Sequence, residues 1–243
     1  MALERQPITI LVVSDRPERA LDDVYDPARW QGVDLIISCG DLSATYLSNL
    51  VSRLNVPLYY VRGNHDTGYQ EAPPEGGEDI SGRLVEYRGW RFLGLDGAPR
   101  YNGEPLQYSD AAMARRALWL TPRLWLAGGF DVLVTHAPPA YCDWAYTRCC
   151  PPAGAGRLCR YNPNRICLDA DDRAHWGFRT LTSLIQRYQP AYALHGHCHL
   201  TYARVPREVR LGKTRVLNAF GHVIVRLTPD VGAEKGEGNP SGV

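Results

Sequence analysis

Short runs of apolar residues alternate along this chain with polar, glycine-containing loops. The runs are rich in Val, Ile, Leu and Tyr and end at turn-forming residues, a pattern typical of buried β-strands. The predicted strands lie in the sequences ITILVVSD at 8–15, VDLIISCGD at 33–41, VPLYYVRGNHD at 56–66, FDVLVTHAPP at 130–139 and AYALHGH at 191–197. Because the polar residues come last in each run, they are expected at the carboxyl ends of the strands.

Helical spacing separates several of these strands. Apolar residues three and four apart predict helices at 44–54, at 107–127 and near 176–188. Pro122 lies inside the second helix and, because proline lacks a backbone N–H, we expect it to break or restart that helix.

Other strands follow one another directly. The segment around Arg88–Gly89 is typical of a hairpin, and 201–227 contains three further predicted strands. Strand–helix alternation followed by consecutive strands predicts an α/β core with two sheets.

The length of 243 residues suits one substantial domain. We expect a single domain over residues 1–228, interrupted by a cysteine-rich insert at about 141–172. Residues 229–243 are polar and rich in glycine, and we predict that they form a disordered tail.

Net charge and hydropathy narrow the classes of partner. A net charge of +1 gives no support to binding of long nucleic acids or membrane surfaces. The apolar run near the N-terminus is too short to span a bilayer and has no cleavage site, so we expect a cytoplasmic protein. The oligomeric state stays open.

Most of the seven cysteines lie between Cys142 and Cys167. Their spacing lacks the paired C-x-x-C of a zinc ribbon and has no secretory context. Unrelated thiols, one or two disulfides, and a small structural zinc site remain open, in that order of preference.

Residues with metal-binding side chains follow nearly every predicted strand. They are Asp15, Asp41, Asn64, His65, Asp66, His136, His197 and His199. Any one of them has an ordinary explanation, such as helix capping or a place in the core. Oxygen and nitrogen donors from several strand ends together suit one or two divalent cations such as Mn, Fe or Zn.

Short motifs mark these strand ends: GD at 40–41, GNHD at 63–66, the lone histidine of THAPP, and GHCH at 196–199. Together they resemble the calcineurin-like metallophosphoesterase family, from Ile8 to about Leu227 without the insert. The resemblance implies an α/β fold, a four-layer α/β/β/α sandwich of two mixed β-sheets flanked by helices, with a two-metal site.

The resemblance also implies a role for each donor, with one carboxylate bridging two ions. These roles fall to Asp41 as the bridge, Asn64, His136 and His197 at the first ion, and Asp15 and His199 at the second. His65 would act beside the leaving oxygen as an acid or hydrogen-bond donor, oriented by Asp66. The alternative for His65 is a histidine that braces its loop.

One motif departs from the family pattern. The first should read D-x-H, but Pro17 stands where the histidine belongs. Proline cannot bind a metal, so the second ion loses an imidazole. Glu18 is a candidate to replace it from the same loop, with Asp22 and Asp23 as more distant candidates.

Two further residues are candidate substrate contacts. His175 lies at a predicted helix start, where it would bind a substrate phosphate or base; a surface histidine beside a capping Asp is an equal alternative. Asn218, in RVLNAFG, resembles the family's asparagine that helps to shape the floor of the site.

These observations predict a metal-dependent phosphoesterase of small soluble substrates, with phosphodiesters favoured. The resemblance implies attack on phosphorus by a metal-activated hydroxide. The alternative is a non-catalytic ligand-binding or regulatory protein with a degenerate metal site, for which Pro17 is the main support.

Overall fold

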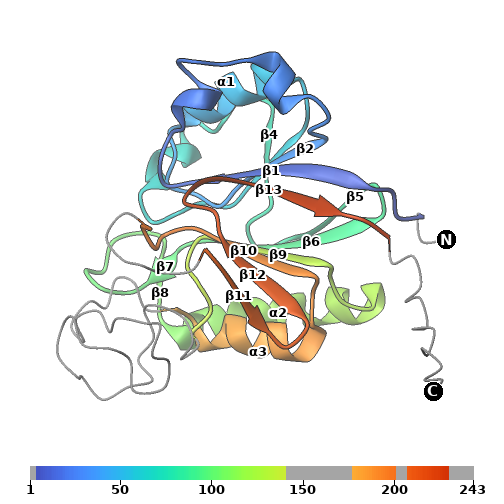
Figure 1. Cartoon of the computed structure of the whole chain (residues 1–243). Coiled ribbons are helices and arrows are strands. Elements are labelled where there is room, and N and C mark those ends of the chain that lie inside the picture. The colour runs from blue at the N-terminus through green and yellow to red at the C-terminus, as the bar shows by residue number, and fades with distance from the viewer. Residues whose placement is uncertain (1–3, 141–176, 201–206, 230–243) are drawn as a thin grey trace, which may run out of the picture.

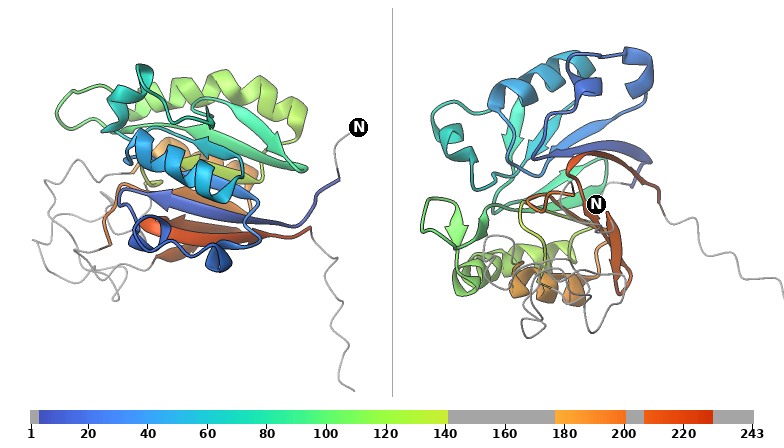
Figure 2. Two further views of the ribbon diagram at one scale, coloured as in Figure 1. Left: turned by 90° about the horizontal axis from the view of Figure 1, so that it is seen from above. Right: turned by 60° about the vertical axis from the view of Figure 1, so that its left-hand side comes forward.

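The computed structural model of the chain describes residues 4–140, 177–200 and 207–229. Two β-sheets pack face to face, with helices on both outer sides (Figure 1). The same stacking is visible from two further sides in Figure 2. The predicted α/β/β/α sandwich of two mixed sheets is therefore confirmed.

The first sheet has the strand order β13–β1–β2–β3–β4. Its strands are β1 (Ile8–Ser14), β2 (Leu35–Ser38), β3 (Leu58–Tyr60), β4 (Gly77–Asp79) and β13 (Gly221–Leu227). Strands β1 to β4 are parallel and β13 pairs antiparallel with β1. The carboxyl ends of the first three strands therefore meet at one edge.

The second sheet has the order β11–β12–β10–β9–β6–β5. Its strands are β5 (Leu84–Tyr87), β6 (Trp90–Leu95), β9 (Val132–Thr135), β10 (Tyr192–His195), β11 (Glu208–Leu211) and β12 (Thr214–Asn218). The hairpin between β5 and β6 turns at Arg88–Gly89, and the last three strands of the chain lie within 201–227, both as predicted. The short strands β7 (Ala98–Pro99) and β8 (Gln107–Tyr108) pair separately.

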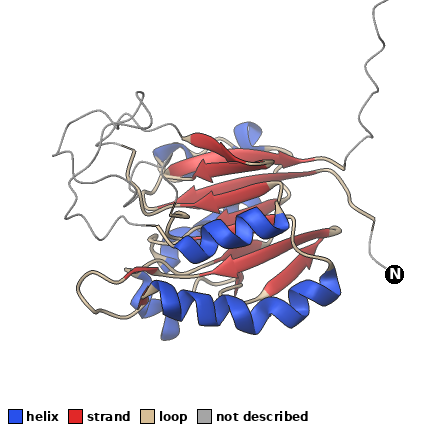
Figure 3. Ribbon diagram, turned by 90° about the horizontal axis from the view of Figure 1, so that it is seen from below, coloured by secondary structure: helices blue, strands red, loops and turns tan. Residues whose placement is uncertain are grey.

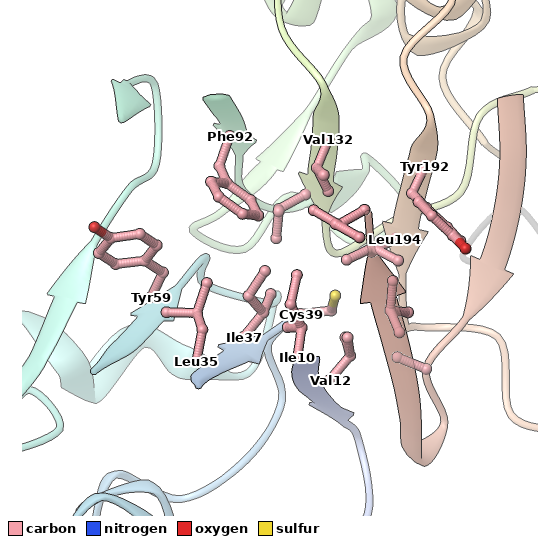
Figure 4. Close-up of a cluster of buried hydrophobic side chains, with 14 of the residues drawn as sticks. Ile10, Val12, Leu35, Ile37, Cys39, Tyr59, Phe92, Val132, Tyr192 and Leu194 are labelled. Carbon is pink, nitrogen blue, oxygen red and sulfur yellow. The ribbon is translucent and has the colours of Figure 1, made fainter. Parts of the chain in front are cut away.

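Apolar side chains from both sheets fill the space between them (Figure 4). Ile10 and Ile37 of the first sheet and Phe92, Val132 and Leu194 of the second are fully buried. Burying each such side chain contributes roughly 1.5–3 kcal/mol. This central layer therefore fixes the position of one sheet against the other.

The helices begin at capping residues. The Ser43 hydroxyl accepts from the Tyr46 N–H at the start of α1 (Ala44–Leu54), and Ser109 caps α2 (Asp110–Ala127) in the same way. Helix α1 covers the first sheet, whereas α2 and α3 (Arg179–Tyr188) lie side by side on the second (Figure 3). Short 3₁₀ helices are η1 (Arg19–Leu21), η2 (Pro27–Trp30) and η3 (Asp66–Gln70).

Helix α2 continues through Pro122, so the predicted break is wrong. Proline removes one hydrogen bond to the carbonyl four residues earlier, here that of Leu118. Both residues are exposed, so water can bind the freed carbonyl. Burial of the opposite face of the helix supplies the stability that the local sequence lacks.

Some predictions fall outside the described residues. They are the cysteine-rich insert at 141–172, His175, and nearly all of the tail at 229–243. In the part of the chain that the structure describes, no helix is both long enough and apolar enough to cross a membrane.

Candidate metal centre

Candidate ligands lie just beyond the carboxyl ends of strands from both sheets. Asp15, Asp41 and Asn64 follow β1, β2 and β3, whereas His136 and His197 follow β9 and β10. Packing of the sheets therefore brings together loops that are far apart in the sequence.

Four donor atoms converge on one point. His136 Nε2 lies 3.2 Å from Asp41 Oδ2, 3.2 Å from Asn64 Oδ1 and 3.1 Å from His197 Nδ1. Possible ligand atoms of Asp41, His136 and His197 all lie within 4.8 Å of one another. Side chains predicted to surround the first ion are thus gathered around one small volume.

Hydrogen bonds turn these donors toward the common point. His136 Nδ1 lies 2.8 Å from the Cys39 carbonyl, which can only accept, so Nδ1 carries a proton and the Nε2 of the neutral ring presents a lone pair. Asn64 donates its amide N–H to the Tyr101 hydroxyl at 3.2 Å, which leaves its oxygen facing the cluster. Acceptors that face one another in this way fit a divalent cation.

In the metal-free protein, the charge around His136 favours a proton on its ring. Burial disfavours a charged imidazole, but the adjacent Asp41 carboxylate outweighs it and raises the pKa of His136 to about 9. Burial opposes ionisation of Asp41 as well, yet His136 and the His65 N–H hold the pKa of Asp41 far below its usual range. The negative charge that favours a proton here also favours a metal ion.

The loops that hold these ligands are tightly bent. Asp15, Asp41 and His197 have φ angles of 63°, 58° and 66°. These values lie in the left-handed region, which residues other than glycine seldom adopt. A Cβ added to Gly63 would lie 2.0 Å from Asp41 Oδ1, and one added to Gly196 would lie 1.9 Å from the Ser14 hydroxyl. The glycines of GNHD and GHCH therefore permit close approach of neighbouring loops.

Asp15 and His199 form a more open pair. Both carboxylate oxygens of Asp15 accept from the His197 N–H, at 2.9 and 3.0 Å, and its side chain is fully buried. His199 Nε2 lies 3.7 Å from Asp15 Oδ1, and this carboxylate raises the pKa of His199. The His199 side chain is half-exposed. The donors predicted for the second ion would therefore enclose that ion less completely than the first set of donors would enclose the first ion.

Among the described residues of the loop after β1, the carboxylates suggested as replacements for the missing histidine pair with arginines. Pro17 is exposed, and Glu18 pairs with Arg16 at 2.7 Å beside β13. The more distant candidates also have other partners: Asp22 pairs with Arg53 and Asp23 with Arg19. Completion of the second site by Glu18 would require its ion pair with Arg16 to break, and it stays a prediction.

A sequence profile of the calcineurin-like phosphoesterases matches residues 9–200, most of the chain and all of the candidate ligands. The chain belongs to the calcineurin-like phosphoesterase family. No curated protein sequence is significantly similar to it.

Solved structures show how widely the fold is shared. One crystal structure superposes with a TM-score of 0.60 at 14% identity, covering 91% of this chain and 95% of the other. The protein TT1561 of Thermus thermophilus has a TM-score of 0.56 at 18% identity, covering 89% and 90%. The phosphopantetheinyl hydrolase of Mycobacterium tuberculosis reaches only 0.45 at 15% identity, covering 94% and 98%. At these identities the first two comparisons establish a common fold.

His65 lies beside the candidate bridging carboxylate. Its backbone N–H donates to Asp41 Oδ1 at 3.0 Å, and its imidazole Nε2 is 4.0 Å from Asp41 Oδ2. The side chain is 70% exposed, so an incoming molecule can reach it. Its role as an acid or hydrogen-bond donor stays a prediction.

The carboxylate of Asp66 makes contacts other than the predicted one with His65. Its Oδ2 accepts from the backbone N–H groups of Asp41 at 2.8 Å and Gly63 at 2.7 Å, which joins the loops after β2 and β3. Burial raises the pKa of Asp66 to about 6, with the nearby Asp41 charge adding to the effect and the N–H donors opposing it. These contacts position the Asp41 carboxylate, whereas orientation of His65 by Asp66 stays a prediction.

Asn218 supports the GHCH loop from below. Its amide donates to the Cys198 carbonyl at 2.7 Å and its oxygen accepts from the Phe220 N–H at 2.9 Å. The residue is only 5% exposed. These contacts agree with a role in the floor of the site, whereas direct substrate contact stays a prediction.

Sequence reasoning missed the loop that supports Asn64. Tyr101 lies 37 residues further along the chain, between β7 and β8. The buried Gln107 holds this loop, because its Oε1 accepts from three successive backbone N–H groups, those of Tyr101, Asn102 and Gly103. No local pattern could have revealed this support, since the contact depends on how distant segments pack.

Proposed function

We propose that the protein is a metal-dependent phosphoesterase of small phosphoesters, with phosphodiesters favoured over monoesters. The observation that carries the proposal is the convergence of Asp41 Oδ2, Asn64 Oδ1, His136 Nε2 and His197 Nδ1 on one point. A divalent cation held there would lower the pKa of water and stabilise negative charge on phosphoryl oxygens.

The chain's own side chains complete the proposed site. The exposed imidazole of His65 lies at the rim, where it can donate a hydrogen bond to a leaving oxygen. The buried Asp66 keeps the loops of Asp41 and Gly63 together, so the donors hold their positions when substrate binds. Preorganised donors of this kind stabilise the charge that develops in a transition state.

The preference for diesters rests on how little positive charge the described residues place at the site. A monoester dianion is usually bound by guanidinium or ammonium groups. Within residues 4–140, 177–200 and 207–229, no Lys or Arg forms an ion pair with the converging donors. Arg16, next to Asp15, pairs with Glu18 at 2.7 Å and stacks 5.1 Å above the Phe220 ring. A singly charged diester therefore suits the site better.

The test compares hydrolysis of bis-p-nitrophenyl phosphate and p-nitrophenyl phosphate after chelation and after addition of Mn²⁺. We expect activity only with metal, and the diester to react faster. Asp41→Asn should lose both metal and activity. His65→Ala should keep its metal but lose about two to four decades of turnover. Activity that survives chelation would exclude the proposal.

A non-catalytic ligand-binding protein is the second candidate function. Its support is the exposed Pro17, which leaves Asp15 and His199 without the family's imidazole. The same assay separates the two functions: a protein that binds Mn²⁺ tightly but hydrolyses neither ester would favour the non-catalytic alternative.

A further inference from the structure

The outer face of α2 carries an apolar surface that the other described residues leave exposed. Leu118, Trp119, Trp125 and Leu126 are 68%, 85%, 76% and 78% exposed. The opposite face of the helix packs on the second sheet through Met113, Ala117, Leu120 and Leu124. Among the described residues, exposed large hydrophobic side chains are concentrated on this helix. Patches of this kind usually mark an interaction site.

The sequence of this face is symmetric about its centre. Residues 118–126 read LWLTPRLWL, so a Leu–Trp pair precedes Pro122 and a Trp–Leu pair follows it. Each exposed side chain is three or four residues from Pro122, which places all of them on one side of the helix. In an antiparallel helix pair centred on Pro122, the pair at 118–119 of each helix faces the pair at 125–126 of the other. A face of this kind is complementary to itself, as a two-fold interface requires.

Charge selects the same orientation. Arg115 is exposed on the same side of α2, one turn before Leu118, and the helix ends at Ala127. An antiparallel copy brings the C-terminal end of the partner's α2 close to this guanidinium. Cations stabilise helix C-termini. A parallel copy would instead bring two Arg115 side chains together.

The exposed apolar surface of α2 is large enough to bind a second copy of the chain. Aromatic side chains bury roughly 150–250 Å² each. The two tryptophans and two leucines would therefore remove on the order of 500 Å² per chain, or about 1,000 Å² in a dimer, near the lower limit for a specific interface.

We propose that the protein forms a two-fold homodimer in which α2 packs antiparallel against α2 of a second copy, with Pro122 at the axis. The interface lies on the outer side of the second sheet and uses none of the metal-donor residues, so both metal centres stay accessible in the dimer.

Sedimentation of the full chain at micromolar concentration tests the proposal. We expect about twice the monomer mass of 27.2 kDa for the natural protein. The double variant Trp119→Ser/Trp125→Ser should weaken association on the order of a hundredfold or more and sediment as a monomer. Val24→Ser, at a 64% exposed position on another face, is the matched control and should stay dimeric. A monomeric natural protein, or a double variant that stays dimeric, would overturn the proposal.

Cross-linking tests the geometry of the interface. Pro122→Cys places a thiol at the axis in both copies, so a short bis-maleimide should join them above the background of the natural cysteines. Ala114→Cys is exposed on the same helix but lies eight residues away, which separates the two thiols by about 24 Å along the helix axis. It should give no added cross-link. Equal cross-linking of both variants would exclude the antiparallel arrangement.

Discussion

At the scale of single residues, the two sets of metal donors differ in how completely they converge. His136 Nε2 lies within 3.2 Å of donors from Asp41, Asn64 and His197, whereas Asp15 and His199 are 3.7 Å apart in a more open pair. With Pro17 in place of a histidine, a second ion would have one ligand fewer than the family pattern implies.

We therefore expect one tight ion per chain and a second that binds at least about ten times more weakly. Calorimetric titration of the metal-free protein with Mn²⁺ measures both affinities. His199→Ala should remove the weak site and leave the tight one unchanged. Two equally tight sites in the natural protein would show that another ligand replaces the missing histidine.

We expect Tyr101 to affect the tight site through its hydrogen bond with Asn64. Because its hydroxyl accepts from the Asn64 amide N–H, Tyr101→Phe should let the amide rotate and weaken the tight ion about tenfold. The same titration measures the change. Tyr25→Phe is the matched control, because the Tyr25 hydroxyl donates to the Arg53 carbonyl in the last turn of α1 and should not affect metal affinity. Equal affinities for the natural protein and Tyr101→Phe would remove Tyr101 from the site.

At the scale of the elements, the loops that follow β1 and β10 must touch. Gly196→Ala would place a Cβ 1.9 Å from the Ser14 hydroxyl and 2.5 Å from Asp15 Oδ2. We expect destabilisation of about 1–3 kcal/mol, or roughly 3–10 °C in Tm. Thermal unfolding measures it. Gly68→Ala, in η3, meets nothing within 4 Å and should leave Tm nearly unchanged. Similar losses in both variants would contradict the close approach.

At the scale of the whole molecule, the site joins the two sheets. Asp41 and Asn64 come from the first sheet, and His136 and His197 come from the second. A bound cation therefore links both halves of the sandwich and stabilises only the folded state. At a metal concentration about 100 times Kd, the gain is roughly 2.7 kcal/mol, or about 5–10 °C in Tm.

Thermal unfolding with and without Mn²⁺ measures this gain. Asp41→Asn should lose the shift, whereas Val24→Ser, which changes an exposed side chain that is not a candidate donor, should keep it. If calorimetry detects Mn²⁺ binding but Tm does not rise, the ion binds outside the junction of the two sheets.

Much of this organisation is present in the sequence itself. Apolar runs that end in GD, GNHD and GHCH located the strands and placed the donors at their carboxyl ends, and α1 has the predicted bounds of 44–54. These features depend on local hydrophobic spacing and on donor chemistry, both of which can be read without knowing how the chain packs. The resemblance of these motifs to the calcineurin-like family then implied the sandwich and the roles of the main candidate ligands.

Only the tertiary structure decided how those groups meet. Tyr101 turns the Asn64 oxygen toward the cluster, Asp66 joins two loops, and Glu18 pairs with Arg16. Helix α2 continues through Pro122 because the sheet buries its inner face. Each of these outcomes depends on contacts between segments brought together by packing, which local patterns do not contain. The sequence determined which donors the protein has, and the packing of its two sheets decided which of them converge.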